Sequence, residues 1–507
     1  MSGHGIVTPG RDLRERTAVA VSDPTLQRAL RNLDRRLGTA ASVQEHHADW
    51  KDRAAAIRRE TLADLDGWLA RLQHSLEALG VQVHHAPTSA DAREIILGIA
   101  RERGATHVAK SKSMATEEID LGAALEADGR HVVETDLGEY IVQLAGERPS
   151  HMITPAIHKT LGQIRDVLSA EAGEELPLSR EELTAWARAR LREEFLASDL
   201  GVTGVNFAAA DTGTLVLVTN EGNGRFCTTL PDVHVAVMAV EKVVPRFADL
   251  GTLLPLLTSS ATGQRLSNYV TMITGPRRSG ELDGPSELHV VILDNNRRGL
   301  IGTPYEEMLA CIRCGACLNV CPVYRYVGGH AYDSVYSGPM GKVLTPLLSA
   351  GEEGRDLPYG STLCGACTEA CPVEIPLADL LVRLRADLRV PGPFHPSPGV
   401  ASPPVVHDAG HGGRRPGEGF PWPQAGASVP ATPLATGRPG VRRIGFTLWS
   451  RAWSSPRGYR LTNAVARAGS RLTGGKRWVR HGLPGWTSGR DLPLPARESF
   501  RTRWKQH

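Results

Sequence analysis

Seven of the eight cysteines in this chain lie in two short runs, at residues 311–321 and 364–371. The first run has the spacing C-x2-C-x2-C-x3-C followed by proline, which is typical of proteins that bind two iron-sulfur clusters. In such proteins the first three thiolates of a run bind one cluster, and the cysteine before proline binds the other. We therefore predict two 4Fe-4S clusters. Cluster 1 would be bound by Cys311, Cys314, Cys317 and Cys371, and cluster 2 by Cys321, Cys364 and Cys367.

The second run is one cysteine short. Ser361 stands three residues before Cys364, where the spacing of the first run would place another cysteine. Iron-sulfur clusters select soft thiolate ligands, so a hydroxyl, a water or a borrowed ligand would hold the iron less firmly. We therefore expect cluster 2 to have a non-cysteine ligand or to exist as a 3Fe-4S cluster.

Two other interpretations of the cysteines are weaker. Structural zinc sites also contain paired C-x-x-C motifs, but a tetrahedral zinc site uses four ligands and does not explain seven cysteines. A disulfide framework requires export, and residues 1–16 are polar and rich in Gly and Arg, without the apolar core of a signal peptide. We therefore expect a cytoplasmic protein whose thiols are reduced and available for metal.

The length and composition indicate a soluble protein with several domains. A chain of 507 residues corresponds to about three domains, and 41% hydrophobic residues allow substantial cores. The apolar stretch at residues 250–257 is too short for a transmembrane helix, so we expect no transmembrane segment. The net charge is only +3 and no basic and aromatic pattern occurs, so we expect no nucleic-acid partner.

The chain up to residue 300 alternates between patterns typical of strands and of helices. Such alternation is typical of parallel βαβ units. We therefore predict an α/β domain at residues 51–300, after an N-terminal arm at residues 1–50. The predicted strands are 81–85, 106–109, 131–135, 215–219 and 233–237, and the predicted helices are 90–103 and 117–127, with an amphipathic helical arm at 54–79.

The pattern changes after residue 300 and again after residue 390. Residues 301–390 are predicted to form a small α-helical dicluster ferredoxin domain, with helices at 304–310 and 377–388. Residues 391–440 contain 22 Pro and Gly in 50 positions, which predicts a flexible linker.

Residues 441–507 form an irregular C-terminal tail with tryptophans among arginines and no acidic residue before Asp491. A basic face of this kind is typical of peripheral membrane contact or of docking to an acidic partner. We favour the alternative that the tryptophans pack on the cluster domain. They are Trp449, Trp453, Trp478 and Trp486.

Several short motifs stand out beside the cysteine runs. They are Ser111-Lys112-Ser113-Met114, Glu134-Thr135-Asp136-Leu137-Gly138-Glu139-Tyr140, Pro155-Ala156-Ile157-His158-Lys159-Thr160, Thr219-Asn220-Glu221-Gly222-Asn223, Cys321-Pro322-Val323-Tyr324 and Gly328-Gly329-His330-Ala331-Tyr332. As a set, these motifs and the cysteine runs resemble the iron-sulfur subunit of the bacterial L-lactate utilisation system, the subunit called B. The resemblance covers roughly residues 40–390 and a patch near residues 484–504.

The resemblance implies a LUD-type α/β domain related to the CoA-transferase and formyltetrahydrofolate cyclo-ligase fold, followed by a dicluster ferredoxin module. It implies an iron-sulfur electron-transfer subunit that acts with two partner subunits and a redox acceptor to oxidise L-lactate to pyruvate. The family also has three cysteines in the second run, whereas the Pro/Gly-rich segment 391–440 departs from it. An alternative function is an acyl or CoA-type ligand-binding protein with structural iron-sulfur clusters.

Two loops that follow predicted strands are candidate ligand sites, residues 110–113 and 220–223. Ligands of open α/β sheets bind at the carboxyl ends of the strands, where backbone amides and lysines suit a carboxylate or phosphate. The alternatives are solvated lysines and a Gly/Asn turn. We predict that Glu221 is the catalytic base and that the ligand is bound by Lys110, Ser111, Lys112, Ser113, Asn220 and Asn223.

Three further residues have weaker signals. His158 and His330 are candidate proton carriers, in the pocket and beside cluster 1 respectively, although single histidines more often pack or form hydrogen bonds. Cys227 lies apart from both runs and is most simply a small buried residue. No G-x-G-x-x-G motif follows a strand and opens a helix, so no nicotinamide or flavin site is predicted.

Overall fold

The computed structural model describes residues 12–31 and 48–388, apart from 266 and 268, and short stretches at 457–458, 461–462, 464, 478–479 and 492–493. The chain divides into two units, Met1–Ala431 and Thr432–His507. The predicted linker at 391–440 lies outside the described residues, as do Trp449, Trp453 and Trp486. In the second unit, strands β11 (Trp478–Val479) and β12 (Leu492–Pro493) form an antiparallel pair.

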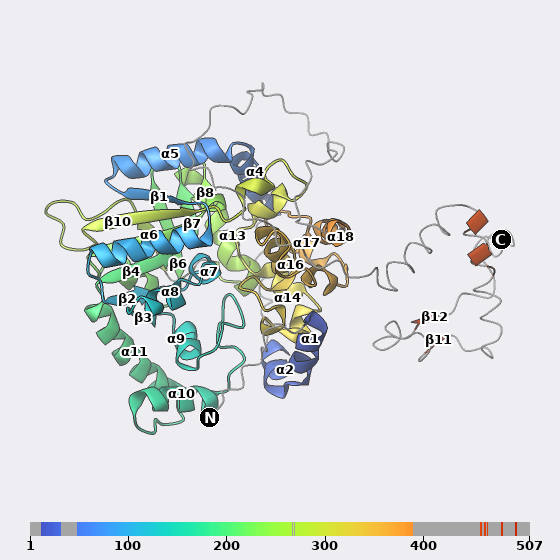
Figure 1. Ribbon diagram of the computed structural model, residues 1–507, viewed down its shortest axis with the longest axis horizontal. Helices are drawn as coiled ribbons and strands as arrows, with labels where there is room; N and C mark the ends of the chain where they lie inside the picture. Colours follow the sequence, from blue (N-terminus) through green and yellow to red (C-terminus); the bar gives the residue numbers. More distant parts are fainter. Residues whose placement is uncertain are drawn as a thin grey trace. The chain divides into compact units, whose positions relative to one another are not determined.

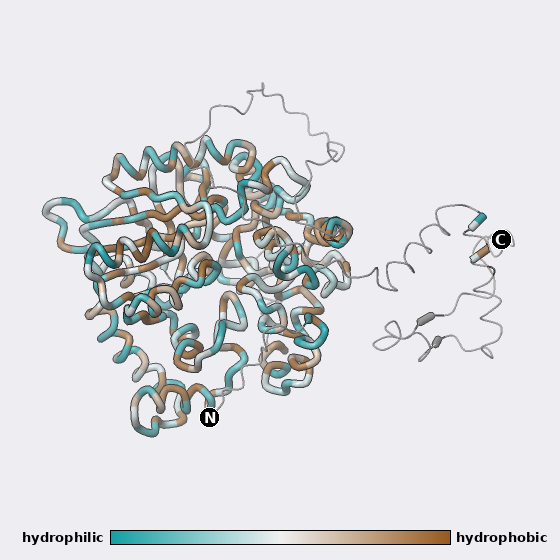
Figure 2. The backbone as a smooth tube through the Cα atoms, viewed as in Figure 1, coloured by the Kyte–Doolittle hydropathy of each residue, from teal (hydrophilic) through white to brown (hydrophobic). Residues whose placement is uncertain are grey.

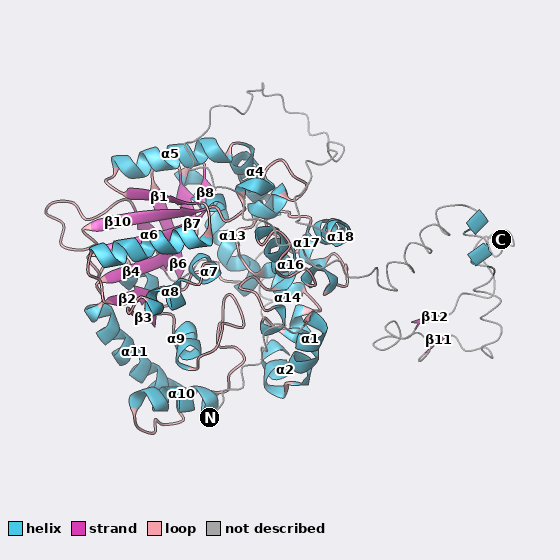
Figure 3. Cartoon of the chain, viewed as in Figure 1, coloured by secondary structure: helices cyan, strands magenta, loops and turns pink. Residues whose placement is uncertain are grey.

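The larger of two sheets in the first unit consists of six strands, all paired in parallel (Figure 1, Figure 3). Strand β7 is buried along its whole length, as expected for a Val-rich strand with both faces covered. The parallel arrangement predicted from the βαβ pattern is confirmed for this sheet. In spatial order, the strands are β1 (Gln82–Ala86), β10 (Glu287–Leu293), β7 (Val233–Ala239), β4 (Leu200–Gly204), β2 (His107–Lys110) and β3 (His131–Glu134).

Alternate residues of these strands pack on opposite faces of the sheet, because side chains alternate along a strand. Val235 and Val237 of β7 share a core with helix α6 (Ser89–Glu102), whereas Ala236 and Met238 share a core with helix α5 (Leu65–Ala78). Figure 2 shows hydrophobic residues concentrated along the strands and hydrophilic residues on the outer sides of these helices. Because all six strands are parallel, their carboxyl ends lie at one common edge of the sheet, and the two layers of helices cover its faces.

A smaller sheet contains the predicted strand 215–219, which is not part of the parallel sheet. Here β6 (Thr214–Thr219) pairs antiparallel with β5 (Phe207–Ala209) and with β9 (Tyr269–Ile273), and β8 (Val243–Val244) extends the sheet beside β5. The expectation of a further parallel strand is wrong because an apolar run predicts a buried strand and does not identify its partner.

Two predicted helices are divided in the structure. The predicted arm at 54–79 is α4 (Ala48–Ala63) and α5, since Asp64 leaves the helical conformation and caps α5 through the backbone amide of Gly67. The predicted helix at 117–127 is α7 (Met114–Glu118) and α8 (Leu121–Ala127), separated at Asp120, whose φ is 51°. The remaining helices of this part are α9 (Leu137–Leu144), α10 (Leu161–Ala172), α11 (Arg180–Ala197), α12 (Asn223–Cys227) and α13 (Leu250–Thr262), with 3-10 turns η2 (Val240–Lys242), η3 (Phe247–Asp249) and η4 (Arg298–Leu300).

The cysteine module, residues 305–388, consists of short helices. The segment predicted as a helix at 304–310 is a 3-10 turn, η5 (Glu306–Ala310), and the last helix is α18 (Leu377–Asp387). Between them lie α14 (Ala316–Val320), α15 (Tyr324–Val327), η6 (His330–Tyr332), α16 (Gly338–Leu348), η7 (Leu357–Tyr359) and α17 (Ala366–Glu369).

The N-terminal helices α1 (Leu13–Ser22) and α2 (Pro24–Arg31) pack on this module (Figure 1). Leu26 shares a core with Cys321 and Tyr324, and Arg16 donates a hydrogen bond to the Ala331 carbonyl at 2.9 Å. The N-terminal segment therefore covers part of the cysteine module. Among the described helices, none combines the length and the hydropathy that a membrane span requires.

Candidate functional site

Four cysteines from both runs line one small cavity of the cysteine module. They are Cys311, Cys314, Cys317 and Cys371. Met308 and Met340 also line this cavity, so its walls are largely apolar. Burial raises the pKa of the Cys314 and Cys317 thiols, and burial with repulsion from Cys311 raises the pKa of Cys371 to about 11.

The two runs have the same local backbone geometry. Arg313 and Gly315 have positive φ on either side of Cys314, and Leu363 and Gly365 have positive φ on either side of Cys364. In both runs a short helix, α14 or α17, begins directly after the glycine. These turns set neighbouring cysteines on one tight loop, which is the arrangement that a cluster-binding run needs. By this correspondence Ser361 occupies the place that Cys311 has in the first run.

The other three cysteines are less uniformly enclosed. Cys321 and Cys367 are buried, and Cys364 is exposed. Burial, and then repulsion from Cys321, raise the pKa of Cys367, which indicates that these two thiols are close. The Ser361 hydroxyl accepts a hydrogen bond from the Leu363 amide at 3.2 Å.

The donor set suits an iron-sulfur cluster. Soft sulfur ligands in an apolar pocket are what such a cluster requires, and a bound metal removes the thiol proton that burial would otherwise retain. Backbone amides already point at sulfur, because Ile375 donates to Cys371 Sγ at 3.3 Å and Tyr324 donates to Cys321 Sγ at 3.4 Å. Lys342, which is 1% exposed, places its ammonium 3.7 Å from Cys321 Sγ.

A cavity of about 690 Å³ lies where the carboxyl edge of the larger sheet meets the cysteine module. Lys112, Glu134 and Glu139 line it from the α/β side, and His330 and Tyr336 line it from the module. A cavity of this size, with side chains from two parts of the chain, has the dimensions of a small-molecule site.

The loop at residues 110–113 reaches this cavity through only one of its predicted ligand-binding side chains. The Lys110 ammonium is buried and donates to Glu117 at 2.7 Å and to Glu134 at 2.6 Å. Ser111 pairs with β4 through its amide, and the Ser113 hydroxyl caps α7. Lys112 lines the cavity, and its ammonium donates to the Ile153 carbonyl at 2.8 Å. Lys110 is therefore neutralised by carboxylates, which leaves Lys112 as the cation of this loop that faces the cavity.

The second predicted loop, residues 220–223, does not line this cavity in the described part of the chain, but it approaches Lys112. Partial burial, and then repulsion from Asp136, raise the pKa of Glu221, while Lys112 acts in the opposite direction. The Asn220 side chain is 3.4 Å from that of Gln264, and Asn223 is buried in α12. The charges of Lys112 and Glu221 therefore interact, which indicates that the two loops lie near each other.

The structure brings His158 and His330 together, with ring centroids 4.6 Å apart. His158 Nε2 is 2.7 Å from a Glu147 carboxylate oxygen, and His330 Nε2 is 2.8 Å from the Arg148 carbonyl. Burial lowers the pKa of both imidazoles and thereby favours their neutral forms. Cys227 is buried 3.4 Å from the Thr135 hydroxyl, and burial raises its pKa to about 12.

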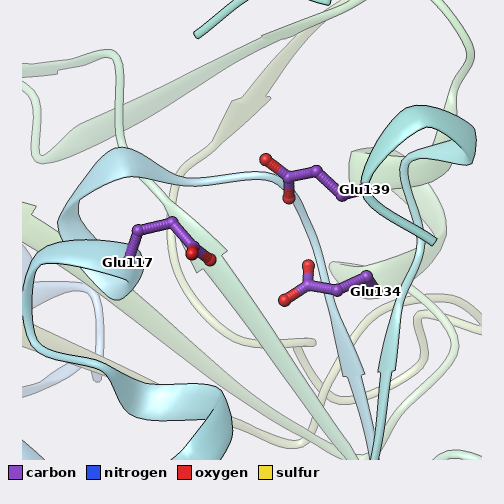
Figure 4. A group of neighbouring side chains, drawn as sticks. All are labelled: Glu117, Glu134 and Glu139. Carbon is purple, nitrogen blue, oxygen red and sulfur yellow. The ribbon is translucent and has the colours of Figure 1, made fainter. Parts of the chain in front are cut away.

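Sequence reasoning missed a group of three carboxylates. Figure 4 shows Glu117, Glu134 and Glu139 directing their carboxylates toward one another, from α7, the end of β3 and the start of α9. One ligand oxygen of each lies within 4.8 Å of the others. The motif at residues 134–140 contains Glu134 and Glu139. Because this motif lies at the end of a predicted strand, the sequence could have indicated that its carboxylates lie at the edge of the sheet where ligands bind.

The chain matches two family models. Residues 69–293 match the LUD domain, and residues 307–375 match the 4Fe-4S dicluster domain. The second match covers all seven cysteines of the two runs.

Curated relatives match over most of the chain. The Escherichia coli protein named Uncharacterized electron transport protein YkgF is 40% identical in an alignment of 507 positions that covers 99% of this chain and 98% of the relative. Lactate utilization protein B of Oceanobacillus iheyensis is 42% identical and covers 90% of this chain and 87% of its own length. Lactate utilization protein B of Bacillus subtilis is 46% identical over 74% of this chain and 79% of its own length.

Proposed function

The chain belongs to the lactate utilization protein B family, and we propose that it is an iron-sulfur electron-transfer protein of lactate utilization. The observation that carries this proposal is the convergence of four cysteines from two runs around one cavity. The finer proposal is that the chain acts with two partner subunits and a redox acceptor in the oxidation of L-lactate to pyruvate. We also propose the domain boundaries given above and a relationship of the α/β domain to the CoA-transferase and cyclo-ligase fold.

We propose two 4Fe-4S clusters, the second with a non-cysteine ligand at the Ser361 position. Cluster 1 would be held by Cys311, Cys314, Cys317 and Cys371, and cluster 2 by Cys321, Cys364 and Cys367. When bound, such clusters supply one-electron transfer. The protein supplies an apolar wall, backbone amides that donate to sulfur and the buried ammonium of Lys342. Together these groups determine the electrostatic environment of the cysteine ligands.

For the substrate, we propose that Lys112 binds a carboxylate at the cavity and that Glu221 accepts the proton of the substrate hydroxyl. Support comes from the position of Lys112 on the cavity wall and from the raised pKa of Glu221, whose loop does not line the cavity but is near enough to Lys112 for the two charges to interact. Asn220 and Asn223 belong to the same loop and would orient Glu221. A base whose pKa is shifted toward neutral pH is suited to proton transfer.

The acidic lining of the cavity argues against the alternative of a CoA-type ligand-binding protein. Glu117, Glu134 and Glu139 all line it, and the phosphates of a CoA-type ligand would be repelled there. The cavity therefore favours small ligands that reach Lys112 without carrying several negative charges.

Anaerobic purification of the full chain with iron and acid-labile sulfide analysis tests the cluster proposal. We expect a brown protein whose iron is reduced by dithionite with new EPR signals. Cys314→Ser should remove cluster 1 and leave part of the iron, whereas Cys227→Ser, a matched loss of one buried cysteine, should keep the full iron content. Stoichiometric zinc with negligible sulfide would overturn the proposal.

The role of Glu221 is tested separately in the assembled complex. Glu221→Gln should lower lactate-dependent reduction of the complex by about 100-fold or more, the usual contribution of a general base, without changing iron content. Glu175→Gln, on a side chain that is 85% exposed, serves as the control. Wild-type reduction in Glu221→Gln would exclude this residue as the base.

A further inference from the structure

Three buried or half-buried carboxylates at the cavity share a single ammonium. The Lys110 ammonium donates a hydrogen bond to one oxygen of Glu117 and another to one oxygen of Glu134. Glu139 is 5% exposed and forms no ion pair within the described part of the chain. When all three carboxylates are ionised, they and one ammonium carry a local charge of about −2, and buried charge of this kind requires compensation by a cation or by a proton.

Two other carboxylates that are largely enclosed at the same cavity each have their own cation. Glu118 pairs with Arg297, and Glu147 accepts from Lys159 at 2.6 Å. Glu139 is therefore the exception among the buried carboxylates of this cavity wall. Burial, and then repulsion from Glu134, raise its pKa well above the usual range.

Two oxygens of the group are buried and accept no hydrogen bond from any described residue. They are Glu134 Oε2 and Glu139 Oε2, whereas Lys110 donates to the other oxygen of Glu134. Buried acceptors without a donor are rare in folded proteins, and a bound ion is one of their ordinary explanations. Figure 4 shows the carboxylate groups of all three residues directed into the space between them.

We propose that Glu117, Glu134 and Glu139 bind a divalent cation of the Mg²⁺ or Mn²⁺ class at the edge of the cavity. Carboxylate oxygens are the ligands these hard cations prefer, and the cavity leaves room for the water that completes their coordination. A dication brings the local charge of the group to about zero while Lys110 keeps both of its hydrogen bonds. The site does not depend on lactate being the substrate or on the cluster assignment.

The geometry also gives the site a place relative to a ligand. Glu117, Glu134 and Glu139 come from α7, β3 and α9, at the carboxyl edge where α/β sheets bind ligands, and all three line the cavity that Lys112 lines. A cation there lowers the repulsion between this acidic wall and the carboxylate of a ligand at Lys112.

Direct Mn²⁺ binding tests the site. The full chain, purified anaerobically with its iron and dialysed against a metal-free buffer, is titrated with Mn²⁺ while free Mn²⁺ is measured by room-temperature EPR. We expect saturable binding that Mg²⁺ displaces. Glu139→Gln keeps the shape of the side chain and should weaken Mn²⁺ binding by at least about 10- to 100-fold, the loss that even an outer-shell substitution causes. Glu134→Gln should have the same effect.

The matched control is Glu126→Gln, which changes an exposed carboxylate of the same cavity that lies outside the group. It should bind Mn²⁺ as the wild type does. Iron content and far-UV circular dichroism identify any variant that is misfolded. Absence of saturable Mn²⁺ binding to the wild type would overturn the proposal and indicate that Glu134 and Glu139 share a proton instead. Unchanged affinity in a folded Glu139→Gln variant would overturn it as well.

Discussion

Glu241 accepts a hydrogen bond from Arg313 at 2.8 Å and thereby joins the end of the larger sheet to the loop that carries Cys311 and Cys314. The Glu241 side chain is fully buried, and its other oxygen lies 2.9 Å from Arg297 Nε. Although burial alone would raise the pKa of Glu241, the two guanidinium groups hold it at about 2. A buried ion network thus couples the α/β domain to the cysteine module.

Removal of this carboxylate should destabilise the protein. Glu241→Ala leaves Arg313 buried without its carboxylate partner, whereas Arg297 keeps its ion pair with Glu118. Removing one partner of a buried ion pair costs about 3–5 kcal/mol in comparable sites. Anaerobic urea unfolding followed by circular dichroism and by iron-sulfur absorbance measures the effect. The control is Glu374→Ala, which breaks a solvent-exposed pair with Arg59 and should cost less than about 1 kcal/mol. Equal unfolding midpoints for the two variants would contradict a structural role for the network.

Lys342 should raise the reduction potential of cluster 2. Its ammonium is 3.7 Å from Cys321 Sγ and 5.4 Å from the centre of the Tyr332 ring, so it acts in a medium of low dielectric constant. Reduction adds a negative charge, which a nearby cation stabilises. Lys342→Met should therefore lower the potential by roughly 60 mV or more, equivalent to about 1.4 kcal/mol for one electron.

An EPR-monitored redox titration of the full chain measures this shift. Lys342→Arg retains the positive charge and should keep most of the potential, while Lys51→Met removes a charge on the cluster 1 side, near Cys371. Cluster 2 should therefore respond to position 342 and not to position 51. A potential that is the same in Lys342→Met and the wild type would show that the ammonium has no electrostatic role.

The sequence predicted four of the six strands of the larger sheet, because buried parallel strands are nearly continuous apolar runs, and it did not predict β4 and β10. The strand predicted at 106–109 is β2 (His107–Lys110), and the strand predicted at 131–135 is β3 (His131–Glu134). The break between α7 and α8 was missed because Asp120 adopts a left-handed conformation without a glycine to signal it. Local pattern also did not reveal that β6 belongs to the antiparallel sheet.

The candidate site was predictable where ligand chemistry fixes local spacing and was not predictable where distant segments meet. The two cysteine runs follow a spacing rule, so their residues could be grouped before the fold was known. Nothing in the sequence near Lys110 shows that Glu134, 24 positions later, reaches its ammonium. The contact between Glu241 and Arg313 likewise spans 72 positions and depends on how two parts of the chain pack.

Mild acid should destabilise the α/β domain through its buried histidines. Burial lowers the pKa of His234 from 6.5 to about 3, so below about pH 6.5 the unfolded chain binds a proton that the folded chain does not. Stability is therefore full above about pH 6.5 and falls as the pH decreases, by about 1.4 kcal/mol per pH unit for this group. Melting temperatures between about pH 7.5 and about pH 5.5 measure the slope. His234→Gln should flatten it, whereas His74→Gln, on an exposed side chain, should not. An identical slope in His234→Gln would show that His234 does not contribute.

Cluster 2 should lose iron more readily than cluster 1, because three cysteines serve it and Ser361 stands at the fourth position. Cys364 is exposed, and the Ser361 hydroxyl already accepts a hydrogen bond from the Leu363 amide at 3.2 Å. An iron without a thiolate at that position is the weakest point of the cluster, and its loss leaves a 3Fe-4S cluster. Brief exposure to air should therefore generate a 3Fe-4S EPR signal, and Ser361→Cys should suppress it by supplying the missing thiolate. Ser334→Cys, in which the new thiol replaces a hydroxyl bonded to Thr345, should leave the signal unchanged. A signal of full size in Ser361→Cys would place the labile iron in the cluster of Cys311, Cys314 and Cys317.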